Sequence, residues 1–422
     1  MISKTGYSQA FVWVWLPGET EPVVAGRLAL AGDHLLFNYG QSYLARENAI
    51  SIYEPELPLK RGVLPLLSGL SMPNCLRDAA PDAWGRRVII NRKLGAKGRK
   101  IDTDELDELT YLLESGSDRI GALDFQLSAT EYIPREAAAA SLDELLQSAG
   151  RVEKGIPLTP DLDKALFHGS SIGGARPKAM IVSNDKKYIA KFSSQNDLYS
   201  VVKAEFVAMR LAAEVGINAA PVSLQHVGGK DVLLIERFDR EKTEGGWRRR
   251  AMVSALTLLE LDEMMARYAS YETLATIIRH RFSSPKSTLR ELFARMLFNV
   301  LCGNTDDHAR NHAAYWDGRS LTLTPAYDIC PQARTGSEAS QAMLIADSHR
   351  LSRIALCLQA APSFLLSRDD ATLMAEHQIT VIRDQWPRIC QEADLSEVDR
   401  NLLWRRQFLN PFAFEESQGL SR

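Results

Sequence analysis

The segment from Gly303 to Asn311 carries side chains that could perform chemistry together. It reads Gly-Asn-Thr-Asp-Asp-His-Ala-Arg-Asn, so that an acid at Asp306 precedes the amide at Asn311 by five positions. A carboxylate here can accept or orient the proton of a hydroxyl group, and an amide oxygen can bind a metal ion. The same pattern is compatible with a turn that Asp306 and Asp307 cap and Asn311 closes, because Asp and Asn are common in loops.

A second acid, Asp328, follows at a distance that strengthens the chemical interpretation. Two short runs, 312–316 and 321–324, flank Asp317-Gly318 and predict a β-hairpin before Pro-Ala-Tyr-Asp328. The chain thus has a helix, an Asp-x₄-Asn loop, a hairpin and a second Asp. This is the order found around a protein-kinase catalytic loop. The second carboxylate would bind Mg²⁺, which prefers hard oxygen ligands. The order of these parts is more specific than any one of them.

The region upstream offers groups that could hold a nucleotide. A loop of small residues, Gly169–Ala175, precedes a predicted hairpin formed by 179–182 and 188–192, and its backbone N–H groups could approach phosphates. Lys191, in the second of these strands, fits a residue that neutralises ATP phosphates. Glu205, on the following helix, could pair with this lysine. The alternative for the loop is an ordinary turn. For Lys191 it is an exposed strand lysine, and for Glu205 it is a solvated helix face.

A third strand ends where a kinase would bind adenine. Residues 232–235 are apolar and predict a strand, and the chain leaves it through Ile235–Asp239. In kinases the chain crosses between lobes at this point and binds adenine through backbone groups. After this segment the sequence is mostly helical in pattern.

The elements that must position these residues indicate an α+β protein. Strands are predicted at 10–16, 23–30 and 35–39, where a small antiparallel sheet is expected, and helical spacing begins near Asp78. Asp197 is placed as the cap of a helix that runs to Glu214 and that Gly216 ends. Apolar residues at three- and four-residue steps predict a buried helix over 289–301, which Gly303 ends.

These patterns divide the chain into five parts. The predicted boundaries are 1–128 for an N-terminal α/β subdomain, 129–163 for a connection, 164–240 for a β-rich ATP-binding portion, 241–410 for a helical C-terminal lobe and 411–422 for a tail.

Composition limits the classes of function. The 422 residues are 45% hydrophobic and carry a net charge of −3, which predicts a large core and no strong direct binding of nucleic acid. The basic stretches 92–100 and 248–250 are predicted to be solvated surface, and the alternative is that they contact nucleic acid. Trp13 and Trp15 are predicted to lie in the core. Five scattered cysteines indicate reduced thiols. No membrane span or export signal is seen, so the predicted compartment is the cytoplasm, without membrane attachment.

The chain resembles the HipA family of bacterial toxin kinases, and four stretches carry this resemblance. They are Ser-Ile-Gly-Gly-Ala-Arg-Pro-Lys (171–178), Ile-Glu-Arg-Phe-Asp (235–239), Asn-Thr-Asp-Asp-His-Ala-Arg-Asn (304–311) and Pro-Ala-Tyr-Asp (325–328). Phe-Asn-Tyr (37–39) and Leu-Arg-Asp-Ala-Ala-Pro-Asp (76–82) resemble the amino-terminal domain of the family. Arg176-Pro177 departs from the Gln-Glu that members often carry, and this proline removes one backbone donor of the loop.

The resemblance implies a HipA-like kinase fold and a role for each site residue. Asp306 would be catalytic, and ATP and Mg²⁺ would be the cofactors. Ser171, or Ser170 beside it, would be the site of a regulatory autophosphorylation. The other implied roles are Mg²⁺ binding by Asn311 and Asp328, phosphate contacts by Ser171, Gly173, Gly174, Ala175 and Lys191, adenine contacts by the backbone of Glu236 and Phe238, ribose approach by Asp239, and a place beside the phosphates for His308.

The implied function is that of a serine/threonine-protein kinase, the toxin of a toxin–antitoxin pair. Its protein substrate would be a translation factor or an aminoacyl-tRNA synthetase, and its partner a small DNA-binding antitoxin. Two alternatives stay open: a kinase for lipids or small molecules, and a non-catalytic co-repressor that joins a DNA-binding partner. The set of Lys191, Asp306, Asn311 and Asp328 argues against the co-repressor.

Overall fold

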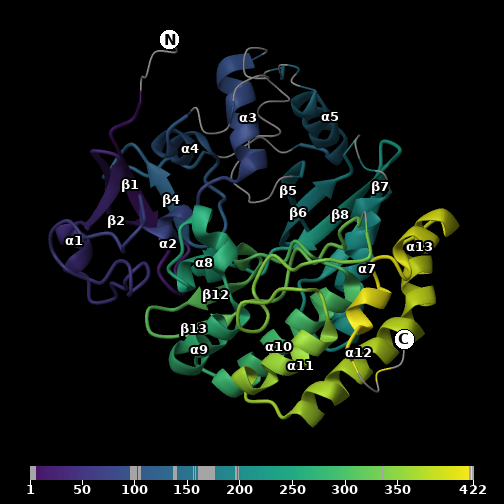
Figure 1. Ribbon diagram of the computed structural model, residues 1–422. Coiled ribbons are helices and arrows are strands. Elements are labelled where there is room, and N and C mark those ends of the chain that lie inside the picture. Colours follow the sequence, from purple (N-terminus) through teal and green to yellow (C-terminus); the bar gives the residue numbers. More distant parts are fainter. Residues whose placement is uncertain are drawn as a thin grey trace. The chain divides into compact units, whose positions relative to one another are not determined.

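The structure of the chain is a computed structural model (Figure 1). It describes residues 6–95, 102, 106–135, 140–154, 156, 158–159, 176–194, 197, 199–334, 336–417 and 420. The chain forms two compact units. The first comprises 1–194, 225–253 and 316–319, and the second comprises 195–224, 254–315 and 320–422. The domain boundaries drawn from the sequence stay predictions.

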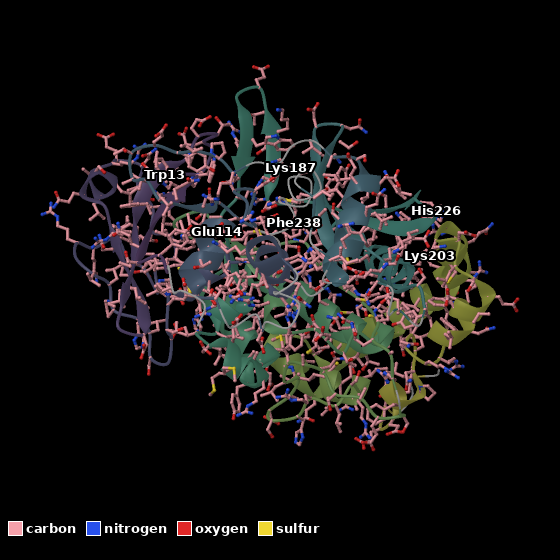
Figure 2. All side chains as sticks on the ribbon, turned by 90° about the horizontal axis from the view of Figure 1, so that it is seen from above. Trp13, Glu114, Lys187, Lys203, His226 and Phe238 are labelled. Carbon is pink, nitrogen blue, oxygen red and sulfur yellow. The ribbon has the colours of Figure 1, made fainter. Side chains whose placement is uncertain are left out.

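The first unit begins with a four-stranded sheet in the order β3-β2-β1-β4. Its strands are β1 (Gln9–Val14), β2 (Val23–Ala31), β3 (His34–Tyr39) and β4 (Leu123–Gln126). The predicted antiparallel pairing of the first three strands is confirmed. Trp13, labelled on the purple N-terminal strands in Figure 2, and Trp15 are buried as predicted. Short helices accompany this sheet, namely α1 (Gln41–Leu44), α2 (Asn74–Arg77) and α4 (Glu108–Glu114).

A second four-stranded sheet has the order β5-β6-β8-β7. Its strands are β5 (Lys178–Ser183), β6 (Lys186–Phe192), β7 (Val222–Val227) and β8 (Lys230–Glu236). The predicted hairpin between β5 and β6 is confirmed, and both residues of its turn, Asn184 and Asp185, have positive φ angles of 49° and 56°. Two consecutive positive φ angles are the mark of a type I′ turn, which fits the twist of paired strands.

Helices α3 (Ala83–Leu94) and α5 (Leu142–Glu153) pack on this second sheet. Helix α5 lies inside the segment that the sequence suggested was a connection. Its apolar residues Leu145, Ala149 and Val152 recur at helical spacing and join the core with Trp84 of α3. A capping box between Ser141 and Glu144 fixes its start. The segment therefore contributes to the core as well as connecting elements.

The prediction of a mostly helical chain after residue 235 is wrong for the next twenty residues. The chain forms a hairpin of β9 (Arg240–Thr243) and β10 (Gly246–Arg249), followed by β11 (Met252–Ser254). These strands are polar and short, so they lack the apolar alternation that announces a strand. The basic run is not simply solvated: Arg248 Nε donates to the Gly18 carbonyl, and the Arg249 guanidinium lies 3.4 Å from the centre of the Trp15 ring system.

The second unit is mainly helical. Its longer helices are α7 (Val201–Glu214), α9 (Tyr271–Arg281), α10 (Pro285–Cys302) and α12 (Arg368–Glu392). Shorter elements are α8 (Ala255–Leu258), η3 (Glu263–Tyr268), η4 (Ala309–Asn311), β12 (Ala313–Trp316), β13 (Leu321–Leu323), α11 (Ile354–Ala360), η5 (Ala361–Phe364), α13 (Glu397–Leu403) and η6 (Pro411–Phe414). The mixture of sheets and helices confirms the α+β class.

Helix α10 is the central element of this unit, and the prediction for it is confirmed. Leu289, Leu292, Phe293 and Met296 are all at most 1% exposed. The predicted cap of α7 is wrong: this helix begins at Val201, with Ser200 at its N-cap, so Asp197 precedes the capping position. Among the described residues, no helix is both long and apolar enough to cross a membrane.

Candidate active site

The loop that follows α10 starts from a helix end that glycine makes possible. Gly303 has a φ of 73°, the left-handed conformation that commonly ends helices. The next residue, Asn304, donates its backbone N–H to the Asn299 carbonyl and its side-chain amide to Asn299 Oδ1, both at 2.9 Å. The start of the loop is therefore tied to the last turn of a buried helix.

We expect Gly303→Ala to lower the free energy of unfolding by about 3 kcal/mol, since strain and overpacking add. A methyl group there would lie 2.7 Å from the Gln407 carbonyl oxygen, and this neighbour is backbone that cannot swing away. Gly216→Ala is the matched control, because Gly216 has a φ of 89° and nothing within 4 Å of such a methyl group. Urea unfolding measures both variants, and equal losses would show that the close approach to Gln407 is unimportant.

Hydrogen bonds between residues close in the sequence fold the loop from Asp306 to Asn311 into a compact turn. His308 N–H donates to the Asp306 carbonyl at 2.9 Å, and Asn311 N–H donates to the His308 carbonyl at 2.8 Å. The side chain of Asn311 closes the turn, because its Nδ2 donates to the Asp306 carbonyl at 3.2 Å. An amide engaged through its nitrogen retains its oxygen as an acceptor, and this is the atom that a cation binds.

Asp328 is electrostatically linked to this turn. Burial raises the pKa of Asp306 above its usual value. The electrostatic interaction with His308 lowers this pKa, and the nearby Asp328 carboxylate raises it further. Asp328 itself has a φ of 58°, a strained conformation for a residue with a side chain. The structure therefore brings Asp306, His308, Asn311 and Asp328 together within the second unit, and two of them are acids that repel each other without a cation.

Asp307 is a buried residue of this loop that sequence reasoning did not single out. One of its carboxylate oxygens accepts from the hydroxyl of Tyr271, on α9, and lies 3.1 Å from His312 Nε2. Asp307 and His312 are both almost fully buried. The contact braces the loop against α9, so the two adjacent acids have different tasks. The only sequence signal was the pairing of acids at 306 and 307, which does not tell which one is buried.

Two of the predicted nucleotide-binding residues, Lys191 and Glu236, lie on the second sheet of the first unit. Lys191 is buried in β6 and stands opposite Leu233 of β8. Glu236 ends β8, and its carboxylate pairs with Lys186 Nζ at 2.7 Å. Phe238, labelled in Figure 2, follows two residues after Glu236. Ser170, Ser171, Gly173, Gly174 and Ala175 lie outside the described residues. Glu205 is buried on α7 of the second unit, and its pairing with Lys191 stays a prediction.

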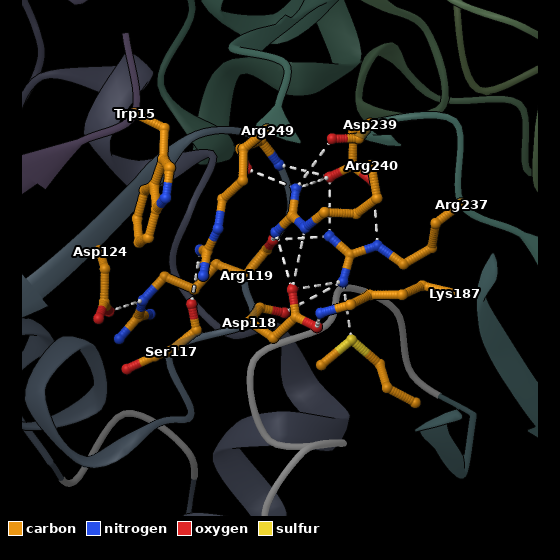
Figure 3. Close-up of polar contacts among 12 residues, drawn as sticks. Trp15, Ser117, Asp118, Arg119, Asp124, Lys187, Arg237, Asp239, Arg240 and Arg249 are labelled. Atoms are coloured by element: carbon orange, nitrogen blue, oxygen red, sulfur yellow. Dashed lines mark hydrogen bonds and ion pairs between the residues drawn. The ribbon is translucent and has the colours of Figure 1, made fainter. Parts of the chain in front are cut away.

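Asp239 lies within a buried network of charged side chains (Figure 3). Its carboxylate accepts from Arg237, Arg240 and the backbone N–H of Gly121 at 2.8–2.9 Å. Burial alone would raise the pKa of this acid, but the two arginines outweigh it and bring the pKa to about 2. A ribose hydroxyl could reach this carboxylate only if the network opened.

The oxygen donors of the second unit fit Mg²⁺ rather than a softer metal. In the part of the chain that the structure describes, no group of three or more His, Cys, Asp and Glu side chains could hold a metal by itself. Mg²⁺ usually takes one or two carboxylates and completes its shell with phosphate oxygens and water. One amide and one or two carboxylates from Asn311, Asp328 and Asp306 meet that requirement.

Comparison with known proteins supports the same interpretation. Residues 170–386 match the model of the HipA-like C-terminal domain, and residues 14–126 match that of the HipA N-terminal domain. A protein of Sinorhizobium fredii named "Putative kinase Y4mE" is 25% identical over 312 residues, which cover 69% of this chain and 71% of that protein. The serine/threonine-protein kinase toxin HipA of Shewanella oneidensis is 28% identical over 186 residues, which cover 38% of this chain and 42% of the toxin.

A solved structure shows the same fold over nearly the whole chain. It contains HipA of Shewanella oneidensis, with HipB and its operator DNA. The TM-score is 0.68 at 20% sequence identity, and the match covers 94% of this chain and 95% of that one. Fold, loop and relatives thus define a kinase-like protein. Within this class, the chain belongs to the HipA-like family, since that model matches more than half of its length.

Proposed function

We propose that the protein is an ATP- and Mg²⁺-dependent serine/threonine-protein kinase that acts in the cytoplasm. The observation that carries the proposal is the loop of the second unit, where Asp306, Asn311 and Asp328 are gathered at the end of a buried helix. Asp307 is engaged by Tyr271 and His312, so Asp306 is the acid of this pair that remains for a substrate.

Each residue has a defined part in the transfer. Asp306 orients the Ser or Thr hydroxyl and takes its proton, while the hydroxyl oxygen forms a bond to the γ-phosphorus of ATP. The bond from that phosphorus to the β,γ-bridging oxygen breaks, and ADP leaves with the electron pair. Asn311 and Asp328 would hold Mg²⁺, which supplies charge neutralisation on the phosphates. Lys191 would contact the phosphates, and the backbone of Glu236 and Phe238 would contact adenine.

Control of the activity is part of the proposal. Phosphate on Ser171 or Ser170 would add roughly two negative charges to the 169–175 loop and oppose ATP phosphates, so the kinase would switch itself off. The Shewanella relative was solved with HipB and operator DNA, which supports a toxin–antitoxin pair with a small DNA-binding antitoxin here. The protein substrate would belong to the translation machinery.

Incubation with Mg²⁺ and γ-labelled ATP, followed by mass spectrometry, tests this function. We expect label on the protein, with phosphate between His168 and Lys178, and no label when EDTA removes Mg²⁺. Label elsewhere on the chain would support a kinase and contradict self-control at this loop. Absence of ATP binding in calorimetry would favour the co-repressor. ATP turnover only with lipids or small molecules would favour that kinase class.

A further inference from the structure

A buried network of charged side chains lies in the first unit, on elements other than those that carry Asp306. Its central members are Asp118, Arg237, Asp239 and Arg240, with Lys187 at its edge (Figure 3). Arg237 and Arg240 have side chains that are at most 1% exposed. Buried charges are costly unless they are paired, so such a cluster persists only where its geometry is satisfied.

Asp118 is the acid at which three cations meet. Its Oδ1 accepts from Arg237 Nη1 at 3.1 Å and from Arg240 Nε and Nη2 at 3.0 and 2.9 Å. Its Oδ2 accepts from Lys187 Nζ at 2.5 Å. Burial opposes its ionisation, yet these cations keep the pKa of Asp118 well below its usual value. The acid is therefore ionised and joins β6 and the end of β8 to the 117–121 segment.

Backbone groups of that segment satisfy the rest of the network. The Arg119 carbonyl accepts from both Arg237 and Arg240, and the Gly121 carbonyl accepts from Arg240 Nη1 at 2.8 Å. In return, Gly121 N–H donates to Asp239 at 2.8 Å. These contacts bridge residues more than 115 positions apart in the sequence, so residues 118–121 form a fixed support for the chain that leaves β8.

The support acts on three residues of the 236–240 segment, Arg237, Asp239 and Arg240. The side chains of Arg237 and Asp239 are held by the network, while Arg237 N–H donates to the Lys187 carbonyl of β6 at 2.8 Å. Residues 238 and 239 lie in a turn, and holding the side chains of residues 237 and 239 restricts the backbone rotation of the residues beside them. Those neighbours are Glu236 and Phe238, whose backbone groups the proposed function assigns to adenine.

We infer that Asp118 is a positioning residue for the nucleotide: through Arg237 and Arg240 it holds the adenine-binding backbone of 236–238 in place. This inference rests on the proposed function. It assigns to the HipA N-terminal segment a part in ATP binding that needs no contact with ATP. It also gives Asp239 a supporting task in place of a ribose contact.

Asp118→Asn is the test, with Asp124→Asn as the matched control. Asp124 is another buried acid in the same unit, where it accepts from Arg119 Nε at 2.9 Å and Arg135 Nη2 at 2.8 Å. None of the described contacts of its carboxylate reaches residues 235–240. Both variants lose a buried acid beside two arginines, so a merely structural effect would be similar in both.

Binding of the non-hydrolysable analogue AMPPNP with Mg²⁺ is measured by calorimetry, well below the unfolding temperature of each variant. This experiment separates a positioning role at the nucleotide site from a merely structural role. We expect Asp118→Asn to weaken AMPPNP binding about tenfold or more, because small misplacements at a site are costly. Asp124→Asn should change it less than about twofold. Binding of inorganic tripolyphosphate with Mg²⁺ should be unchanged in both, since this probe has no adenine.

The outcomes are distinguishable. Wild-type affinity for AMPPNP in Asp118→Asn, or an equal loss in both variants, overturns the positioning role and leaves the kinase proposal standing. Failure of the wild-type protein to bind AMPPNP overturns the kinase proposal and this inference with it. If Asp118→Asn does not fold, Arg240→Lys keeps a charge opposite Asp118 but loses the fork to Arg119 and Gly121, and the same loss of AMPPNP affinity is expected.

Discussion

Asp306→Asn should lower the rate of phosphoryl transfer by about a thousandfold while AMPPNP still binds, because a positioned acid or base contributes about that much. The variant keeps the size of the side chain and removes its ability to take the hydroxyl proton. The Asp306 backbone carbonyl, which accepts from Asn311 and His308, is untouched by the change, so the loop should keep its shape.

Label transfer to the protein from γ-labelled ATP measures the rate, and calorimetry measures the binding. Asp347→Asn is the control, since Asp347 is an exposed acid of the same unit that also has a positive φ, of 50°. It should transfer label like the wild type. Label transfer by Asp306→Asn at the wild-type rate would remove this residue from the mechanism.

A large effect on stability is expected at Glu56, a buried acid of the N-terminal region. Burial raises its pKa from 4.5 to about 7, against a lowering by the Cys75 N–H that donates to Oε2 at 2.7 Å. The other oxygen, Oε1, is buried with no hydrogen-bond partner. An unpaired carboxylate is costly in such a place, whereas a protonated acid is tolerated.

The sign follows from proton uptake. Between pH 4.5 and about 7 the folded protein holds a proton at Glu56 that the unfolded chain releases, so this stabilisation is complete below pH 4.5 and is lost as the pH rises through 7. The loss is about 3 kcal/mol at pH 8 relative to pH 4.5. Glu56→Gln should lack this loss, since its amide stays neutral and its oxygen can still accept from Cys75.

Urea unfolding at pH 5 and pH 8 tests the assignment. The quantity compared is the difference in free energy of unfolding between wild type and Glu56→Gln, because the contributions of other titrating groups cancel in this difference. The exposed Glu47→Gln is the control and should follow the wild type at both values. Parallel stability curves for wild type and Glu56→Gln would show that Glu56 ionises normally in the folded protein.

The candidate site of the second unit could be predicted because its parts are close in the sequence. Asp306 and Asn311 are five positions apart, Gly303 ends the preceding helix, and the hairpin before Asp328 has its own turn signal. Hydrogen bonds within such a turn depend on local spacing, which a sequence displays. Helix α10 was visible for a similar reason, because apolar residues recur at helical steps over residues 289–301.

The hairpin of β9 and β10 and the start of α7 were misjudged because both depend on contacts beyond the local sequence. The strands REKT and GWRR carry little apolar character, and their arginines are used in contacts with distant residues such as Gly18 and Trp15. For α7, an acid at Asp197 looked like a cap, but the helix begins four residues later. Element boundaries depend on tertiary packing as much as on capping preference.

By itself the sequence determined the kinase-like loop, the two predicted hairpins, the buried helix and the order in which the proposed catalytic residues follow one another. Only the tertiary structure decided which acid of the Asp306–Asp307 pair is braced by Tyr271, and that Asp118, Arg237, Asp239 and Arg240 form one network. Tyr271 and Asp307 are 36 positions apart, and Asp118 and Arg240 are 122 positions apart. Charge pairing over such distances leaves no periodicity in the sequence, because it depends on where the folded backbone brings each side chain.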